Sequence, residues 1–190
     1  MPRRNSFCSL VFLSPMKTSK KKFIRWIPSG KRIGIQRRES ILMNKSYLTA
    51  ITRRDLPRPT QWLMDKGLIR GRVLDYGCGK CYLINPMEWD SYDPNFPTSG
   101  IYPPYDTIIC NYVLCVLPRA ERIPVLKRIH GALSSDGKAY ISVRNDRPKN
   151  GWGKSSRGTY QGRVANLPME ELYKCSGFRI YVLTTDTKLV

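Results

Sequence analysis

Asp75, Gly77 and Gly79 form the segment of this chain whose residue types and spacing best suit the binding of a small cofactor. They follow the apolar pair Val73 and Leu74, a pattern typical of a buried parallel strand that ends in a tight turn. Glycine has no Cβ atom, so a ligand can approach the backbone at both positions. Asp75 adds a carboxylate at the carboxyl end of the expected strand. The spacing therefore predicts a cofactor-binding turn.

The same segment indicates which cofactor the turn would accept. A dinucleotide-binding fingerprint needs a third glycine where Tyr82 stands, and it places a pyrophosphate on the amino end of a helix. The carboxylate of Asp75 would repel that pyrophosphate. S-adenosylmethionine has no phosphate and carries an ammonium and a sulfonium group, which suit an acid beside the turn. The residues thus favour an adenosylmethionine site over a nicotinamide or flavin site.

Asp93 supplies a second acid, eighteen positions after Asp75. It closes the segment 89–93, which predicts the next strand, and an acid about 20 residues beyond a glycine turn can accept both ribose hydroxyls of a nucleoside. An Asp-x-Gly-x-Gly segment alone is often only a loop; the strand before it and the acid after it favour cofactor binding. The predicted cofactor-binding residues are Asp75, Gly77, Cys78, Gly79 and Asp93.

The rest of the chain predicts the elements that must position these residues. Buried strands without clean alternation are typical of parallel sheets, and apolar side chains at helical spacing are typical of a covering helix. Further strands are predicted at 105–112, 139–143, 162–165 and 178–183, with a helix at 119–133 that residues 134–137 end. This alternation predicts an α/β fold with a doubly wound, mostly parallel sheet. The short last connection predicts an antiparallel last strand.

Two residues end the predicted central strand. Asn111 and Tyr112 would face the methyl group that adenosylmethionine transfers, and they are the predicted catalytic residues. A strand-end polar group and a core aromatic are equally consistent with their positions. His130, the single histidine, lies near the end of the predicted helix, which favours stabilisation of that terminus over a role as general base.

Residues 144–161 are the predicted substrate-facing segment. They combine five basic side chains with two aromatic ones, and their glycine, proline and serine residues predict a loop. Basic groups can bind phosphates while an aromatic ring stacks on a base, and a solvated basic loop without a partner fits the same pattern. The predicted substrate-binding residues are Arg144, Trp152, Tyr160 and Gln161.

Six short motifs follow one another along the chain. They are Val73 to Gly79, Tyr92-Asp93-Pro94, Tyr105 to Ile108, Val113 to Pro118, Ala139 to Arg144 and Gly158 to Gln161. Together they resemble class I S-adenosylmethionine-dependent methyltransferases, and within that class the small bacterial and phage methyltransferases associated with DNA phosphorothioation. The resemblance implies a Rossmann-like fold and adenosylmethionine as cofactor. The chain departs from the class at Cys81, where a third glycine is usual, and at residues 80–89, which are short for a helix.

Six cysteines allow a rival interpretation of the glycine turn. Cys78 and Cys81 form one close pair and Cys110 and Cys115 a second, and a structural zinc site needs four ligands, often in two such pairs. Cysteine also behaves as a small hydrophobe in an apolar run. The sequence therefore favours a site without a metal over a zinc site or a redox dithiol. The low cysteine density and the absence of a convincing export signal favour the reducing cytoplasm.

Charge divides the chain at about residue 42. Residues 1–42 carry eleven Lys and Arg against the single acid Glu39, a net charge of +10 out of +19 for the whole chain. We expect this leader to be disordered or non-native. It fits an organellar transit peptide, a basic arm on nucleic acid, or sequence that precedes a true start at Met43. Residues 43–190 are predicted to form one methyltransferase-like domain.

A domain of this size leaves no room for a separate target-recognition domain. No apolar run approaches the roughly 20 residues that span a membrane. The sequence therefore predicts an adenosylmethionine-dependent methyltransferase that acts on a nucleic acid, a nucleotide or another small acceptor. The alternative is a non-catalytic nucleic-acid-binding protein that keeps the same fold.

Overall fold

The computed structural model describes residues 48–50, 55–80, 88–96, 100–146, 153–154, 160–162 and 164–189 of the 190-residue chain. The leader 1–42, Cys81 and Trp152, which enter the sequence predictions, lie outside these ranges. Within the described ranges, no helix is long and apolar enough to span a membrane.

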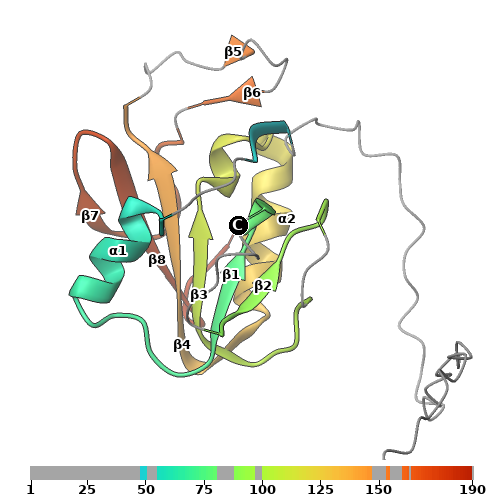
Figure 1. Ribbon diagram of the computed structural model, residues 1–190, viewed down its shortest axis with the longest axis vertical. Coiled ribbons are helices and arrows are strands. Elements are labelled where there is room, and N and C mark those ends of the chain that lie inside the picture. Colours follow the sequence, from blue (N-terminus) through green and yellow to red (C-terminus); the bar gives the residue numbers. More distant parts are fainter. Residues whose placement is uncertain are drawn as a thin grey trace, which may run out of the picture. The chain divides into compact units, whose positions relative to one another are not determined.

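Six strands form one mixed sheet (Figure 1). They are β1 (Val73–Tyr76), β2 (Asp90–Tyr92), β3 (Tyr105–Asn111), β4 (Leu133–Arg144), β7 (Glu170–Lys174) and β8 (Phe178–Thr184). Their order across the sheet is β2-β1-β3-β4-β8-β7. Neighbours from β2 to β4 are parallel, and β8 is antiparallel to both β4 and β7. The predicted mostly parallel α/β sheet with an antiparallel last strand is confirmed.

One row of register partners defines the first face of the sheet. Leu74, Ile108, Ala139 and Leu183 pair across four strands. All four are buried in the core cluster to which helix α2 (Arg119–His130) contributes. Because successive side chains of a strand point to opposite faces, the residues next to this row lie on the other side of the sheet.

The second face packs against helix α1 (Arg58–Asp65). Leu63 of this helix is buried in a cluster with Tyr140 of β4. Asp75 pairs with Ile109, which in turn pairs with Tyr140, so Asp75 belongs to the row on the α1 face. With a helix on each face, the sheet is doubly wound, as the sequence predicts.

The sequence placed the end of the helix 119–133 wrongly. The helix ends at His130, and Leu133 is already the first residue of β4, where it pairs with Tyr105 of β3. Residues 134–137, predicted to stop the helix, therefore lie within β4. Their pairing is irregular, with a register shift between Tyr105 and Thr107, so the turn-like composition marks a bulge rather than a loop.

The strand predicted at 162–165 is also wrong. Gly162 and Val164 are buried in irregular chain, and Val164 packs in the α2-side core. Besides β4, the neighbour of β8 is β7, a strand that the sequence did not suggest. It lies at the edge of the sheet and has three charged residues among its five, and charged side chains are common on edge strands because they oppose further pairing.

A separate antiparallel pair follows β4. It consists of β5 (Gly153–Lys154) and β6 (Tyr160–Gln161). Figure 1 draws this pair beyond the carboxyl end of β4, on the side where the parallel strands end. The predicted substrate-facing segment 144–161 therefore begins at the carboxyl edge of the sheet.

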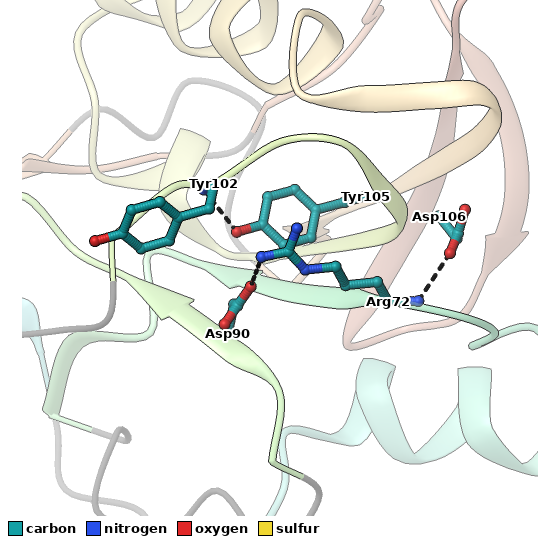
Figure 2. Close-up of polar contacts among 5 residues, drawn as sticks. All are labelled: Arg72, Asp90, Tyr102, Tyr105 and Asp106. Atoms are coloured by element: carbon teal, nitrogen blue, oxygen red, sulfur yellow. Dashed lines mark hydrogen bonds and ion pairs between the residues drawn. The ribbon is translucent and has the colours of Figure 1, made fainter. Parts of the chain in front are cut away.

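The amino edge of the sheet carries a charge cluster (Figure 2). Arg72 donates from Nη2 to Oδ2 of Asp90 at 2.7 Å, and its guanidinium lies 4.7 Å from the centroid of the Tyr105 ring. Asp106 accepts the backbone N–H of Arg72 at 2.8 Å and the hydroxyl of Ser134 at 2.9 Å. The charged groups of this amino-edge cluster thus bind one another and the adjacent backbone.

Candidate functional site

The turn after β1 needs its two glycines. Gly77 and Gly79 have φ values of 78° and 60°, in the left-handed region that residues with a side chain seldom adopt. A Cβ atom on Gly77 would lie 2.2 Å from Cγ2 of Val113, which is closer than two carbon atoms can approach. The N–H of Gly77 donates to the carbonyl of Tyr92 at 2.6 Å and ties the turn to the end of β2. The role of this turn in cofactor binding stays a prediction.

Asp93 joins the two predicted cofactor motifs. It directly follows β2, and its Oδ2 accepts the backbone N–H of Gly79 at 3.0 Å. Its Oδ1 accepts the N–H of Asn95 at 2.8 Å. A carboxylate offers about four lone-pair positions, so a group that orients the glycine turn can also accept hydroxyls of a bound ribose.

Asp75 lies one residue before the end of β1, between Ser91 of β2 and Ile109 of β3 in the register. Its charge acts on a neighbouring thiol: burial raises the pKa of Cys110, and the Asp75 carboxylate raises it further. Cys110 is therefore a neutral thiol at physiological pH. The structure brings Asp75, the glycine turn and Asp93 to the carboxyl ends of two adjacent strands.

Asn111, the last residue of β3, is held from two sides. Its Nδ2 donates to Oγ1 of Thr60 at 2.8 Å, and its Oδ1 accepts the hydroxyl of Ser142 at 2.8 Å. Thr60 and Ser142 are each only 1% exposed. The carboxamide thus links α1, β3 and β4, which is the strand-end polar role that the sequence left open. Contact with a transferred methyl group stays a prediction.

Tyr112 turns the chain sharply after β3. Its φ of 63° and ψ of 5° are left-handed, and its N–H donates to the carbonyl of Ser142 at 2.9 Å. Its own carbonyl accepts the N–H of Cys115 at 3.1 Å, within the short 3-10 helix η3 (Val113–Cys115). The half-buried Tyr112 side chain packs against the α1-side cluster. Its predicted catalytic role stays a prediction.

The η3 turn contacts three neighbouring segments. Val113 lies against Gly77. Cys115 accepts the backbone N–H of Arg144 on its Sγ at 3.2 Å, and its carbonyl accepts the N–H of Gly162 at 2.9 Å. Gly162 directly follows β6. The η3 turn therefore lies between the glycine turn and both ends of the predicted substrate segment.

Arg144, the last residue of β4, forms a two-point ion pair with Asp146. Its Nε donates to Oδ1 at 2.8 Å and its Nη2 to Oδ2, and its side chain is 33% exposed. These bonds raise the pKa of Arg144. Tyr160 and Gln161 form β6, while Trp152 lies outside the described residues. The structure brings Arg144 and the residue after Gln161 to η3, and substrate contact stays a prediction.

The zinc interpretation concerns cysteines that are buried here. Cys78, Cys110 and Cys115 are all buried, and burial raises the pKa of Cys115 to about 11. In the part of the chain that the structure describes, no group of three or more His, Cys, Asp or Glu side chains is placed to hold a metal ion. Cys81, the remaining member of the two pairs, lies outside the described residues.

Sequence reasoning missed several residues at this edge. Thr60 and Ser142 bind Asn111, and Ala50 lies beside the glycine turn, where a Cβ atom on Gly79 would be 3.2 Å from the Cβ of Ala50. Thr60 lies in an eight-residue helix whose clearest signal is a proline at its start. These are ordinary residue types without a motif, so the tertiary contacts are what identify them.

Comparison with known proteins gives matches among solved structures. No family model matches the chain, and no curated protein is significantly similar to it. A TehB-like SAM-dependent methyltransferase from Corynebacterium glutamicum ATCC 13032 Kitasato is 22% identical, with a TM-score of 0.41 and coverage of 65% of this chain and 85% of that chain. The magnesium protoporphyrin IX methyltransferase from Synechocystis PCC 6803 with bound SAM is 17% identical, with a TM-score of 0.37 and coverage of 65% and 74%.

A third similar structure is that of the glycopeptide N-methyltransferase MtfA in complex with S-adenosyl-L-homocysteine. It is 13% identical, with a TM-score of 0.36. The match covers 67% of this chain and 72% of that chain.

Proposed function

We propose that this chain is an S-adenosylmethionine-dependent methyltransferase. The observation that carries the proposal is the hydrogen bond between the Asp93 carboxylate and the N–H of Gly79, because it joins the two predicted cofactor motifs into one site. Both motifs lie at the carboxyl ends of parallel strands, where open α/β sheets bind their ligands. The order of the sequence motifs, which resembles class I methyltransferases, supports the same activity.

The charges of the site fit adenosylmethionine better than a dinucleotide. Asp75 and Asp93 flank the glycine turn, and two acids favour a cation and disfavour a pyrophosphate. Asp75 would bind the methionine ammonium directly or through a water molecule, and Asp93 would bind the ribose hydroxyls. Gly77, Cys78 and Gly79 would let the cofactor lie against the backbone.

Adenosylmethionine supplies a methyl group on a sulfonium, and an acceptor displaces it in line. The chain's part in this step is to hold donor and acceptor in a near-attack arrangement, which can supply much of the rate. Asn111 and Tyr112 would line the path of the methyl group, since they end the strand that neighbours β1. The bonds from Thr60 and Ser142 would keep the Asn111 side chain in one orientation there.

The acceptor is proposed to bind beyond β4, against the segment that begins with Arg144. Arg144, Trp152, Tyr160 and Gln161 would contact it. Residues 43–190 carry a net charge of +9, which favours an anionic acceptor such as a nucleic acid or a nucleotide. The motifs also resemble those of methyltransferases associated with DNA phosphorothioation.

Calorimetric titration tests the cofactor. The purified protein should bind adenosylmethionine and its demethylated product, S-adenosylhomocysteine, more tightly than NAD. Tighter binding of NAD would contradict the proposal, because it would show that the acids at the turn tolerate a pyrophosphate.

Transfer of a labelled methyl group tests the activity. The protein is incubated with methyl-labelled adenosylmethionine and with separate fractions of nucleic acid, nucleotides and other small molecules. Label in one fraction identifies the acceptor class. Cofactor binding without transfer to any fraction would instead favour the alternative, a non-catalytic nucleic-acid-binding protein that keeps the fold.

A further inference from the structure

Thr60 anchors a chain of hydrogen bonds across three elements. It lies in α1, and its Oγ1 accepts from Nδ2 of Asn111, whose Oδ1 accepts from the hydroxyl of Ser142 in β4, each at 2.8 Å. Thr60 and Ser142 are buried, and Asn111 between them is half-buried. Loss of either partner removes one of the two bonds that hold the Asn111 carboxamide. The chain of bonds therefore fixes the orientation of Asn111 strongly.

The residue after Asn111 needs such support. Tyr112 is a bulky residue in the left-handed region, where its Cβ atom lies too close to the following carbonyl oxygen. Such a conformation persists only where the surroundings impose it. Ser142 contributes twice, because its hydroxyl binds Asn111 and its carbonyl accepts the N–H of Tyr112 at 2.9 Å. Thr60 holds the same junction from the α1 side.

The left-handed Tyr112 sets the path of η3. The carbonyl of Tyr112 accepts the N–H of Cys115, and Val113, the first residue of η3, lies against Gly77. The space where a Gly77 side chain would be is filled by the Val113 methyl, so a shift of η3 leaves the glycine turn without its neighbour. The contacts thus run without a gap from Thr60 to the turn.

We propose that Thr60 is a positioning residue for the glycine turn. Its hydroxyl fixes Asn111, Asn111 fixes the left-handed Tyr112, and η3 then holds Gly77 in place. The inference rests on the proposed function only for the identity of what the turn binds. In this proposal Thr60 acts through Asn111 and η3 rather than by contact with the cofactor or the acceptor.

Thr107 provides a matched control within the same molecule. It is also a buried threonine, 2% exposed, with a hydrogen-bonded hydroxyl, which donates to the carbonyl of Arg70 at 2.7 Å and accepts the N–H of Arg70 at 3.0 Å. It lies near the amino end of β3, whereas Thr60 acts at the carboxyl end. A role in stability alone predicts the same behaviour from both threonines.

The experiment compares Thr60→Val, Thr60→Ser and Thr107→Val in the full chain. Valine keeps the shape of threonine without its hydroxyl, and serine keeps the hydroxyl. Thr60→Val should weaken adenosylmethionine binding about fivefold, the factor that corresponds to the net free energy of one hydrogen bond. Thr60→Ser should bind adenosylmethionine with the affinity of the unsubstituted protein. Thr107→Val should lower the melting temperature and leave the affinity unchanged, measured by calorimetry well below that temperature.

Hydrogen exchange gives a second readout that needs no cofactor. The amides of Cys115 and Val116 are bonded to the carbonyls of Tyr112 and Val113. They should exchange faster in Thr60→Val and not in Thr107→Val. If Thr60→Val does not fold, Ser142→Ala breaks the same chain of bonds from its other end and should give the same exchange pattern.

The outcomes separate the two proposals. Unchanged affinity and unchanged exchange in Thr60→Val overturn the positioning role, whatever the melting temperature does. Equal effects of Thr60→Val and Thr107→Val on both readouts also overturn it, because they would reflect stability alone. If the unsubstituted protein binds no adenosylmethionine, the proposed function fails, and the exchange rates of the η3 amides still decide the role of Thr60.

Discussion

The carboxyl and amino edges of the same sheet hold their charged groups in different ways. At the amino edge, the Arg72 guanidinium binds Asp90 and lies over the Tyr105 ring, so opposite charges meet directly (Figure 2). At the carboxyl edge, the Asp93 carboxylate accepts a backbone N–H of the glycine turn. The acid of the amino edge thus forms an exposed ion pair, whereas the acid of the carboxyl edge orients a turn.

Backbone strain alone does not distinguish the two edges. Gly71 at the amino edge has a φ of 62°, and a Cβ atom there would lie 2.2 Å from the Asp106 side chain. Gly77 at the carboxyl edge has a φ of 78°, and its Cβ would lie 2.2 Å from Val113. The difference is in the neighbours, because Asp106 is exposed while Val113 belongs to a turn that is bonded to two further segments. The contacts of the two glycine turns therefore distinguish the edges, whereas the backbone strain of the turns does not.

Gly77→Ala should have the largest effect on the carboxyl edge. The methyl group disfavours the left-handed backbone by about 1 to 2 kcal/mol and overpacks the contact with Val113 by about 1 to 3 kcal/mol. Both effects fall on the proposed cofactor turn. We expect adenosylmethionine affinity to fall roughly a hundredfold, the factor that about 2.8 kcal/mol produces, in a calorimetric titration.

Gly71→Ala is the matched control for this prediction. It places the same group in the same backbone conformation and against a neighbour at the same distance, but at the amino edge. The melting temperature should fall while the affinity for adenosylmethionine stays unchanged. A comparable loss of affinity in both variants would mean that binding follows overall stability, and the contrast between the edges would fail.

The two ends of β2 offer a second, smaller contrast. Asp93→Ala removes the acceptor for the N–H of Gly79 and the proposed partner of the ribose, so it should weaken adenosylmethionine binding roughly tenfold, as expected for a hydrogen bond to a charged group. Asp90→Ala removes the exposed pair with Arg72 and should change stability by about 1 kcal/mol or less.

Affinity and thermal unfolding are measured on both aspartate variants. The expected pattern is loss of affinity in Asp93→Ala alone. Normal binding by Asp93→Ala would remove the proposed role of this acid, and weakened binding by Asp90→Ala would show that the amino edge also acts on the cofactor site.

Local patterns were enough to predict the parts of the fold that depend on local sequence. The segment ending in Gly77 and Gly79 combines an apolar strand with residues that permit a left-handed turn, so its geometry follows from residue type. The place of Asp93 after the next strand follows from the usual length of a strand-to-strand connection. Both motifs lie where the sequence indicates, at one edge of a sheet.

Contacts between distant residues were beyond the reach of those patterns. Thr60 and Asn111 are 51 positions apart, and Asn111 and Ser142 are 31 apart, so their bonds depend on how α1 packs on the sheet. The edge strand β7 was missed because its charged residues obscure the apolar alternation. Tyr112 was expected at a strand end, but its left-handed conformation is imposed by neighbours rather than by residue type.

Arginines at the two edges allow a smaller test of the proposed acceptor. Arg144 at the carboxyl edge and Arg72 at the amino edge each pair with one aspartate. If a phosphate of single-stranded DNA replaces Asp146 on Arg144, Arg144→Gln should lower the log-log salt slope of DNA binding by about 0.7. Arg72→Gln should leave the slope unchanged. Equal slopes in both variants would place the bound phosphates elsewhere on the chain.

The smallest expected effect is the acid sensitivity of the amino edge. The backbone N–H of Arg72 and the hydroxyl of Ser134 donate to the Asp106 carboxylate, and these bonds hold the pKa of Asp106 below its ordinary value. Because the folded protein binds the proton less readily than the unfolded chain, ionised Asp106 stabilises the fold above the ordinary aspartate pKa of about 3.9. That contribution is lost as the pH falls through the lower pKa of the folded state. Melting temperatures measured from pH 6 downwards, to about pH 3, should therefore fall less steeply for Asp106→Asn than for the unsubstituted protein. Identical curves for the two proteins would show that the carboxylate of Asp106 contributes nothing to the amino edge beyond the shape of its side chain.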